Sequence, residues 1–134
     1  MRISVSLRVC GERLSPDEIT SILGVHPHAA KSKGEVRTSS SGQEVVAKVG
    51  LWTWKSGPTG QLLTVNDHID RLHAAFAHVY PSLASLPHAE NTWIDICIVK
   101  EDGEGERDGM DFLLSAKAIQ ILGETGLPVE FTFY

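Results

Sequence analysis

The chain has 134 residues, enough for one domain with a single hydrophobic core. Its 17 Asp and Glu residues outnumber its 12 Lys and Arg residues, and the formal net charge of -5 argues against nucleic acid as a partner. The apolar runs are too short to span a membrane, and Cys10 and Cys97 lack a C-x-x-C spacing, so we expect a cytoplasmic protein with free thiols.

Residues 1–10 are predicted to form a half-buried strand. Apolar and polar residues alternate along it, and this period of two places each set on its own face. The apolar set is Ile3, Val5, Leu7 and Val9, and the polar set is Arg2, Ser4, Ser6 and Arg8. We therefore expect one face of this strand to lie on the core and the other to be polar.

A helix over residues 16–23 follows, with signals at both ends. Ser15 can accept a hydrogen bond from the first turn, Pro16 suits the first helical position, and Gly24 suits a left-handed stop. The next segment, residues 25–43, is polar and rich in Ser, Lys and Gly, so we expect a loop that contains at most a short edge strand.

Three further strands and two further helices complete the predicted pattern. Two of the strands, over residues 92–99 and 129–134, show alternation, and the longer helix carries apolar residues every three or four positions. The strands are expected over residues 44–55, 92–99 and 129–134, and the helices over residues 66–80 and 116–122. Asn66 or Asp67 is expected to cap the longer helix, Pro81 to end it, and Ser115 to cap the last helix.

The order of elements, β-α-(β)-β-α-β-α-β, indicates the fold class. Most strands are apolar on one face only, whereas the strands of a doubly wound parallel sheet would be apolar on both. We therefore expect a single α+β domain over residues 1–134. It would be a two-layer sandwich, roughly ferredoxin-like, with helices on one face of a mostly antiparallel sheet.

A succession of short motifs resembles the bacterial family known as domain of unknown function 4279. The motifs are LRVCGERLSPDEITSILG at residues 7–24, a Lys-Gly-Glu turn at residues 33–35, a Gly-Leu-Trp strand at residues 50–52, and an aromatic-rich strand that ends at Tyr134. Their order extends over nearly the whole chain. The resemblance implies a fold and a small bacterial cytoplasmic protein, but no activity, cofactor or catalytic residue.

Trp52 and Trp54 are the first candidate binding residues. Two positions apart in a strand, they share a face opposite Leu51. If Leu51 faces the helices, both indoles lie on the outer sheet face, where paired aromatic side chains mark a binding surface. The alternative is that a bulge at Gly50, or a covering loop, buries the rings, and we favour burial of at least one indole.

Lys31, Lys33 and Arg37 form the only local basic cluster, with Gly34 between them. The cluster lacks the spacing of a phosphate-binding P-loop, so a solvated loop is the favoured interpretation. Such cations could still hold a phosphate or a carboxylate. Together with the two indoles, they would form the pocket of a small anionic-ligand binding domain or a minor enzyme.

The histidines and the acidic residues match no known metal site. His68, His73 and His78 are five residues apart, which is too far around a helix to share a metal, so we interpret them as surface or boundary histidines. The acidic, glycine-rich segment that begins near Asp102 resembles a calcium loop. Counted from Asp102, however, Arg107 is at the sixth position, which needs Gly, and Leu113 is at the twelfth, which needs Glu. We expect no metal and no cofactor.

These observations favour a non-catalytic protein-interaction module. Glu104 and Glu106 in the acidic segment, or the outer sheet face, would contact a partner protein. An immunity or antitoxin-like role, in which this chain neutralises a basic enzyme, is one form of this hypothesis. We lean against an enzyme, because no Gly-x-Ser-x-Gly or Cys-His signature is present. The anionic-ligand domain is the alternative, and self-association through a strand edge is compatible with either.

Overall fold

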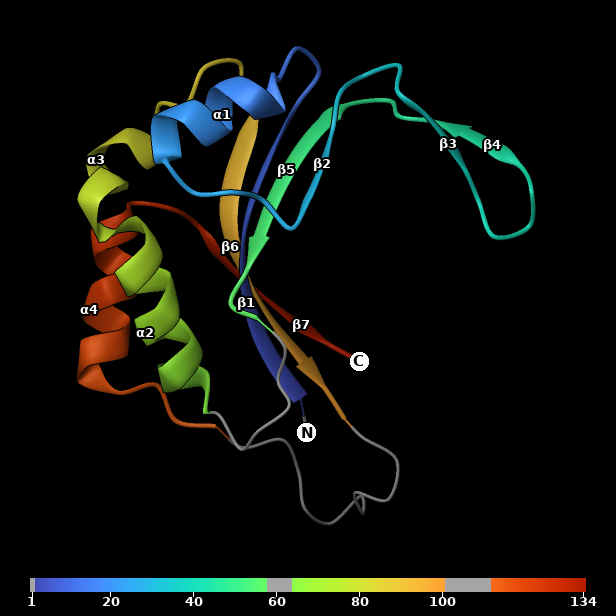
Figure 1. Ribbon diagram of the computed structural model, residues 1–134. Helices are drawn as coiled ribbons and strands as arrows, with labels where there is room; N and C mark the ends of the chain where they lie inside the picture. The colour runs from blue at the N-terminus through green and yellow to red at the C-terminus, as the bar shows by residue number, and fades with distance from the viewer. Residues whose placement is uncertain (1, 58–63, 101–111) are drawn as a thin grey trace.

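The structure, a computed structural model, describes residues 2–57, 64–100 and 112–134. Figure 1 shows a twisted five-stranded sheet with the helices packed on one face and a two-stranded hairpin that projects from one edge. The expected α+β sandwich, with helices on one face of a mostly antiparallel sheet, is therefore confirmed.

The sheet has the strand order β2-β5-β1-β6-β7, and neighbours are antiparallel except for β6 and β7, which are parallel. The strands are β1 (Arg2–Gly11), β2 (Ala29–Lys31), β5 (Gly50–Lys55), β6 (Asn91–Val99) and β7 (Val129–Phe133). The hairpin consists of β3 (Val36–Thr38) and β4 (Glu44–Val46). Because β1 is the central strand, its polar residues lie in the middle of the outer sheet face.

The predicted strand over residues 44–55 is wrong in its continuity, because the chain leaves one sheet and enters another within it. β4 pairs with β3, whereas β5 pairs with β1 and β2. At Gly50, an added Cβ would lie 2.9 Å from both the Cβ and the backbone oxygen of Leu14. The backbone approaches so closely that only glycine fits without a shift, and β5 begins at this residue.

The helices are α1 (Pro16–Leu23), α2 (Val65–Phe76), α3 (Tyr80–Leu83) and α4 (Ala116–Thr125), with a 3-10 turn (Ala77–Val79) between α2 and α3. The signals of α1 are confirmed. Ser15 accepts a hydrogen bond from the Glu18 N–H at 3.5 Å, and Gly24 is left-handed with a φ of 69°. Ser115 likewise caps α4 by accepting from the Ala118 N–H at 3.0 Å.

The boundaries of the long helix differ from the prediction. Thr64 caps α2, and Asp67 completes the capping box by accepting from the Thr64 N–H at 2.8 Å, which lowers the pKa of Asp67. Asn66 instead bridges to the start of α4, where its side chain accepts from the Ser115 N–H. Pro81 lies in the first turn of α3 and so begins a helix rather than ending one.

The core lies between the helices and the inner face of the sheet. The apolar set of β1 faces it, as predicted, and its central residues are fully buried. The largest completely buried side chains include Trp52, Phe76, Leu7, Ile19, Ile69, Leu72, Ile94 and Ile96. Since the inner face takes most of the apolar side chains, the polar residues of β1 lie on the outer face.

Candidate functional site

Both indoles of β5 face the core. Trp54 lies opposite Leu7 and Trp52 opposite Val9, so they share the inner face, and they are 8% and 0% exposed. The Trp52 Nε1–H donates to Thr20 Oγ1 at 3.0 Å, which joins the sheet to α1. The expectation that at least one indole is buried is confirmed. Pairing with β1 runs without a bulge, so Leu51 takes the outer face.

Trp93 is the tryptophan that faces outward, and sequence reasoning missed it. It lies opposite Arg8 in the register of β1 and β6 and is half-buried. The signal was present in the sequence. Ile94, Ile96 and Ile98 occupy one face of this strand, so Trp93 must lie on the other.

The centre of the outer face is a paired polar cluster. The carboxylate of Asp95, only 4% exposed, lies 3.3 Å from Arg8 Nη2 and accepts a hydrogen bond of 2.8 Å from Thr132 Oγ1. Arg8 Nε also donates to Ser6 Oγ at 3.2 Å. Because the buried carboxylate already has a cation and a donor, this cluster stabilises the sheet.

The two cysteines are free, as expected. Cys97 lies opposite Ser4, while Cys10 lies six residues further along β1, which is about 20 Å in a strand. A disulfide needs Cα atoms within about 7 Å, so the two thiols cannot bridge within one chain. Burial, reinforced by Asp95, raises the pKa of the Cys97 thiol.

His68 is not a surface or boundary residue, as the sequence predicted, but is fully buried. Its Nδ1 lies 2.6 Å from Ser56 Oγ, which also accepts from the Val5 N–H at 3.0 Å. Its Nε2 has no hydrogen-bond partner among the described residues. Burial, with a smaller contribution from Arg71, lowers the pKa of His68. Ser56 directly follows β5 and His68 lies on α2, so this buried Ser–His contact joins the helix to the sheet.

The other two helical histidines do lie at boundaries. His73 Nδ1 is 2.9 Å from the Tyr80 hydroxyl, and His78 Nε2 is 3.0 Å from the Leu23 carbonyl oxygen. Burial, followed by the charge of Glu124, raises the pKa of Tyr80 to about 12. Within the described part of the chain, no three His, Cys, Asp or Glu residues are placed to hold a metal ion.

The β3–β4 hairpin, residues 36–46, is called the arm below. Figure 1 shows that it projects beyond the main sheet. Val36 lies opposite Val46 on one of its faces, and Arg37 lies opposite Val45 on the other. The three valines are 52–57% exposed, so each face of the arm presents apolar surface to solvent.

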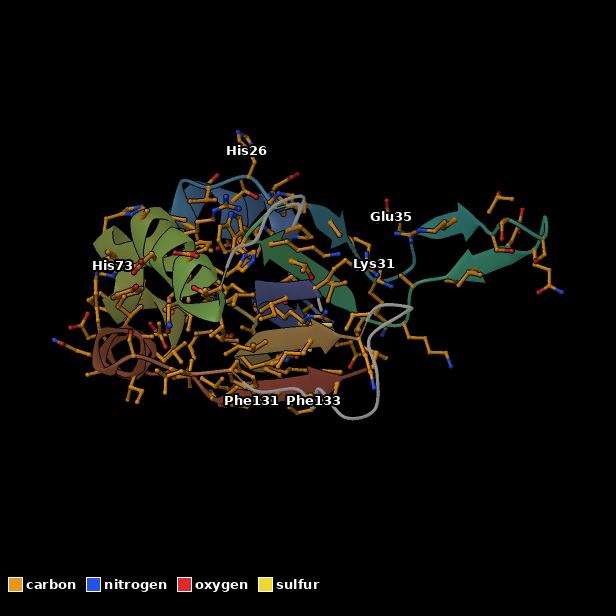
Figure 2. All side chains as sticks on the ribbon, turned by 90° about the horizontal axis from the view of Figure 1, so that it is seen from below. His26, Lys31, Glu35, His73, Phe131 and Phe133 are labelled. Atoms are coloured by element: carbon orange, nitrogen blue, oxygen red, sulfur yellow. The ribbon has the colours of Figure 1, made fainter. Side chains whose placement is uncertain are left out.

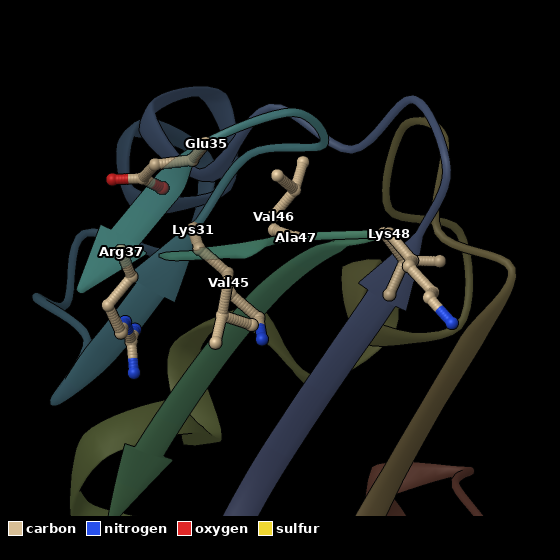
Figure 3. Close-up of a pocket in the computed structure, with 8 residues that line it drawn as sticks. Lys31, Glu35, Arg37, Val45, Val46, Ala47 and Lys48 are labelled. Carbon is tan, nitrogen blue, oxygen red and sulfur yellow. The ribbon is translucent and has the colours of Figure 1, made fainter. Parts of the chain in front are cut away.

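A cavity of about 320 Å³ lies where the arm joins the sheet, and Figure 3 shows the side chains around it. Figure 2 places Lys31 and Glu35 at the root of the arm, far from His73 on the helices. The lining residues are Lys31, Glu35, Arg37, Val45, Val46, Ala47, Lys48 and Val49. This cavity, called the arm cavity, therefore combines three cations and one carboxylate with an aliphatic wall.

The structure brings only part of the predicted basic cluster together. Lys31 and Arg37 line the arm cavity, whereas Lys33 pairs with Glu12, and this pairing lowers the pKa of Glu12. Lys48 joins the cavity from a position that sequence reasoning did not single out. Neither Trp52 nor Trp54 lines it, so the predicted pocket of indoles and cations does not form.

A second exposed apolar surface lies on the edge strand β7. Phe131 and Phe133 are 40% and 54% exposed, and Figure 2 shows them next to each other along this strand. Phe131 stacks on Phe112 with ring centroids 5.8 Å apart. Glu104 and Glu106, the predicted acidic contacts, lie outside the described residues.

Comparison with known proteins gives a family but no activity. Neither the curated proteins nor the solved structures include a match to this chain. Across residues 2–57, 64–100 and 112–134, the structure has no helix with the length and apolar character that a bilayer crossing requires. The model of one family, described as a domain of unknown function (DUF4279), matches residues 1–134, which is the whole chain. The chain therefore belongs to the DUF4279 family.

Proposed function

We propose that this protein is a non-catalytic interaction module of the bacterial cytoplasm that binds a partner protein through the arm. The observation that carries the proposal is the exposure of Val36, Val45 and Val46 on a hairpin of two three-residue strands. An isolated two-stranded hairpin is only marginally stable in water. Burial of these three side chains against a partner would contribute on the order of 2–4 kcal/mol to binding.

The polar contacts of the outer sheet face and of α2 support a structural use of the reactive side chains. Asp95 is neutralised by Arg8, and the Ser56–His68 pair is buried, so neither group is presented to a substrate. An interaction module needs surface complementarity and no such chemistry.

The acidic segment supplies a second contact in this proposal. Glu104 and Glu106 suit a basic surface on the partner, as in an immunity or antitoxin-like protein that neutralises a basic enzyme. The arm would supply apolar contact area, and the acidic segment would supply electrostatic steering.

An anion-binding domain is the second candidate. It is favoured by the three cations of the arm cavity, whose volume lies at the lower end for small-molecule sites. Arg37 and Lys31 would hold the anion. In this alternative the partner is a small carboxylate or phosphate, and the valines of the arm serve only to wall the cavity.

The proposal is tested by comparing Val46→Lys with Ile119→Lys. Ile119 lies on α4 and is 58% exposed against 55% for Val46, so the control adds the same charge to an equally exposed apolar position away from the arm. Each tagged variant is used to capture proteins from native lysate, with quantification by mass spectrometry and a thermal melt to confirm folding.

Val46→Lys should reduce recovery of a stoichiometric partner at least tenfold, because it places a charge in the apolar contact. Ile119→Lys should leave recovery unchanged. Equal recovery by both variants, or no protein recovered by the wild type, would count against docking through the arm.

A further inference from the structure

We infer that the arm cavity binds an acidic, extended segment of the partner protein. Carboxylates of that segment contact Lys31, Arg37 and Lys48, and its aliphatic groups pack on the valines of the arm. This inference rests on the proposed function, because it names the chemistry of the partner that the arm would dock.

The cavity carries a net positive charge, because three cations and one carboxylate line it. Of its four charged residues, the single carboxylate, Glu35, already accepts a hydrogen bond of 3.0 Å from the Ser32 N–H. Within the described part of the chain, none of the cations Lys31, Arg37 and Lys48 forms an ion pair. Three like charges around one concavity repel one another, and an acidic ligand would relieve that repulsion.

The cavity is positive although the chain is acidic, because the negative charge is concentrated elsewhere. Residues 101–111 hold six acidic residues and one basic residue, a net charge of -5 that equals that of the whole chain. The remaining 11 acidic residues (17 minus 6) balance the remaining 11 basic residues (12 minus 1). Residues 31–49 contain four basic and two acidic residues, so the arm and its root are a local positive surface.

The described residues on either side of the acidic segment lie far from this cavity. Lys100 follows Val99, which pairs with Arg2, whereas Lys31 is in register with Cys10 through Leu51. Nine residues along the strands and three strands across the sheet therefore separate Lys100 from Lys31, a distance of about 33 Å. Phe112, stacked on Phe131 at the opposite edge, is about 25 Å from the same place.

An extended protein segment fits this surface better than a small anion. The cavity is open on the solvent side, and two of its aliphatic residues, Val45 and Val46, are more than half exposed. In the two-stranded sheet of the arm, β3 and β4 each have a single strand partner, so each leaves one edge for strand addition. A segment that alternates acidic and aliphatic residues would place carboxylates on one side and apolar groups on the other.

The experiment uses the full chain and a capped eight-residue peptide in which Glu alternates with Val. The comparison probes are the same peptide with Gln in place of Glu, free glutarate, and a peptide with the sequence of residues 101–111. Binding is measured by calorimetry at low and high salt. The variants are Arg37→Glu and Lys48→Glu, both on exposed side chains. Lys117→Glu is the control, with the same charge reversal on α4.

The Glu–Val peptide should bind the wild type and Lys117→Glu equally, bind both cavity variants at least tenfold more weakly, and lose affinity as salt rises. The Gln peptide should not bind. The inference is overturned if the peptide fails to bind or if the cavity variants bind it normally. It is also overturned if glutarate binds as tightly, which indicates a small-anion site, or if the 101–111 peptide binds best, which indicates a second copy.

The failure of this inference can be distinguished from failure of the proposed function. If Val46→Lys loses the captured partner while Arg37→Glu and Lys48→Glu retain it, the arm still docks a protein, but the partner contact is not acidic. If all three variants retain the partner, docking through the arm itself is contradicted.

Discussion

Acid should destabilise this protein through His68. The imidazole is fully buried, and burial lowers its pKa, so the folded chain keeps the ring neutral where the unfolded chain protonates it with a pKa near 6.5. The unfolded state then binds more protons, and the free energy of unfolding falls as the pH drops below about 6.5. If the folded ring stays neutral down to pH 5.5 while the unfolded ring titrates around pH 6.5, the free energy of unfolding falls by about 1.4 kcal/mol between pH 7.5 and pH 5.5.

The surroundings of the ring explain why protonation is unfavourable. Nδ1 is engaged with Ser56 at 2.6 Å, and Nε2 has no hydrogen-bond partner among the described residues. The nearby cation Arg71 opposes the charged form, and the weaker effect of Asp67 favours it. A proton on the ring would therefore leave a buried charge without a paired anion.

Urea unfolding at pH 7.5 and pH 5.5 measures this effect in the wild type, in His68→Asn and in His73→Asn. Asparagine at position 68 can still hydrogen-bond to Ser56 but does not titrate. In this variant the free energy of unfolding should therefore lose the decrease between pH 7.5 and pH 5.5 that is assigned to His68. His73→Asn is the matched control, because it removes a half-buried imidazole from the same helix and leaves the His68–Ser56 contact in place, so the pH dependence assigned to His68 should persist in it. If His68→Asn shows the full wild-type slope, the assignment to His68 is refuted.

Three further outcomes follow from the packing. Trp52→Ala should lower the free energy of unfolding by about 3–5 kcal/mol, since it empties a buried site and removes the bond to Thr20; a loss below 1 kcal/mol in urea titration would contradict the buried placement. Gly11→Ala should destabilise the protein by about 1–3 kcal/mol, because the added Cβ would lie 2.1 Å from the backbone oxygen of His88. Gly123→Ala in α4 meets open space and should stabilise the protein by up to about 1 kcal/mol. Thermal melts that rank the two variants in the opposite order would disprove this reasoning. The monomer should titrate with two free thiols after unfolding without reductant, and a single disulfide-linked species in mass spectrometry would be inconsistent with the separation of Cys10 and Cys97.

Local sequence was sufficient for the elements whose causes are local. The alternation of β1 places Val5 and Leu7 on the core because strand side chains alternate regardless of what the strand pairs with. Ser15 and Gly24 delimit α1 because capping bonds connect residues only three or four positions apart. The one-sided polarity of the strands also gave the layer arrangement correctly.

Other features depended on which strands pair and could not be predicted in this way. Alternation shows that Trp52 and Trp54 share a face, but only pairing with Val9 and Leu7 makes that face the inner one. Residues 44–55 read as one strand because nothing in the local residue pattern reveals the change of sheet, which lies between Val46 and Gly50.

The sequence by itself therefore determined the fold class, the caps of α1 and α4 and the polar set of β1. The caps and the alternation depend only on neighbours within a few residues along the chain, whereas the cap of α2, Thr64, was not predicted. Only the tertiary structure decided that His68 is buried against Ser56, 12 residues away, and that Lys48 joins Lys31 and Arg37 around one cavity. The net charge of -5 gave no sign of that positive surface, because a sum over the chain carries no information about position. Burial and charge convergence are set by contacts between distant segments, and these exist only once the chain has folded.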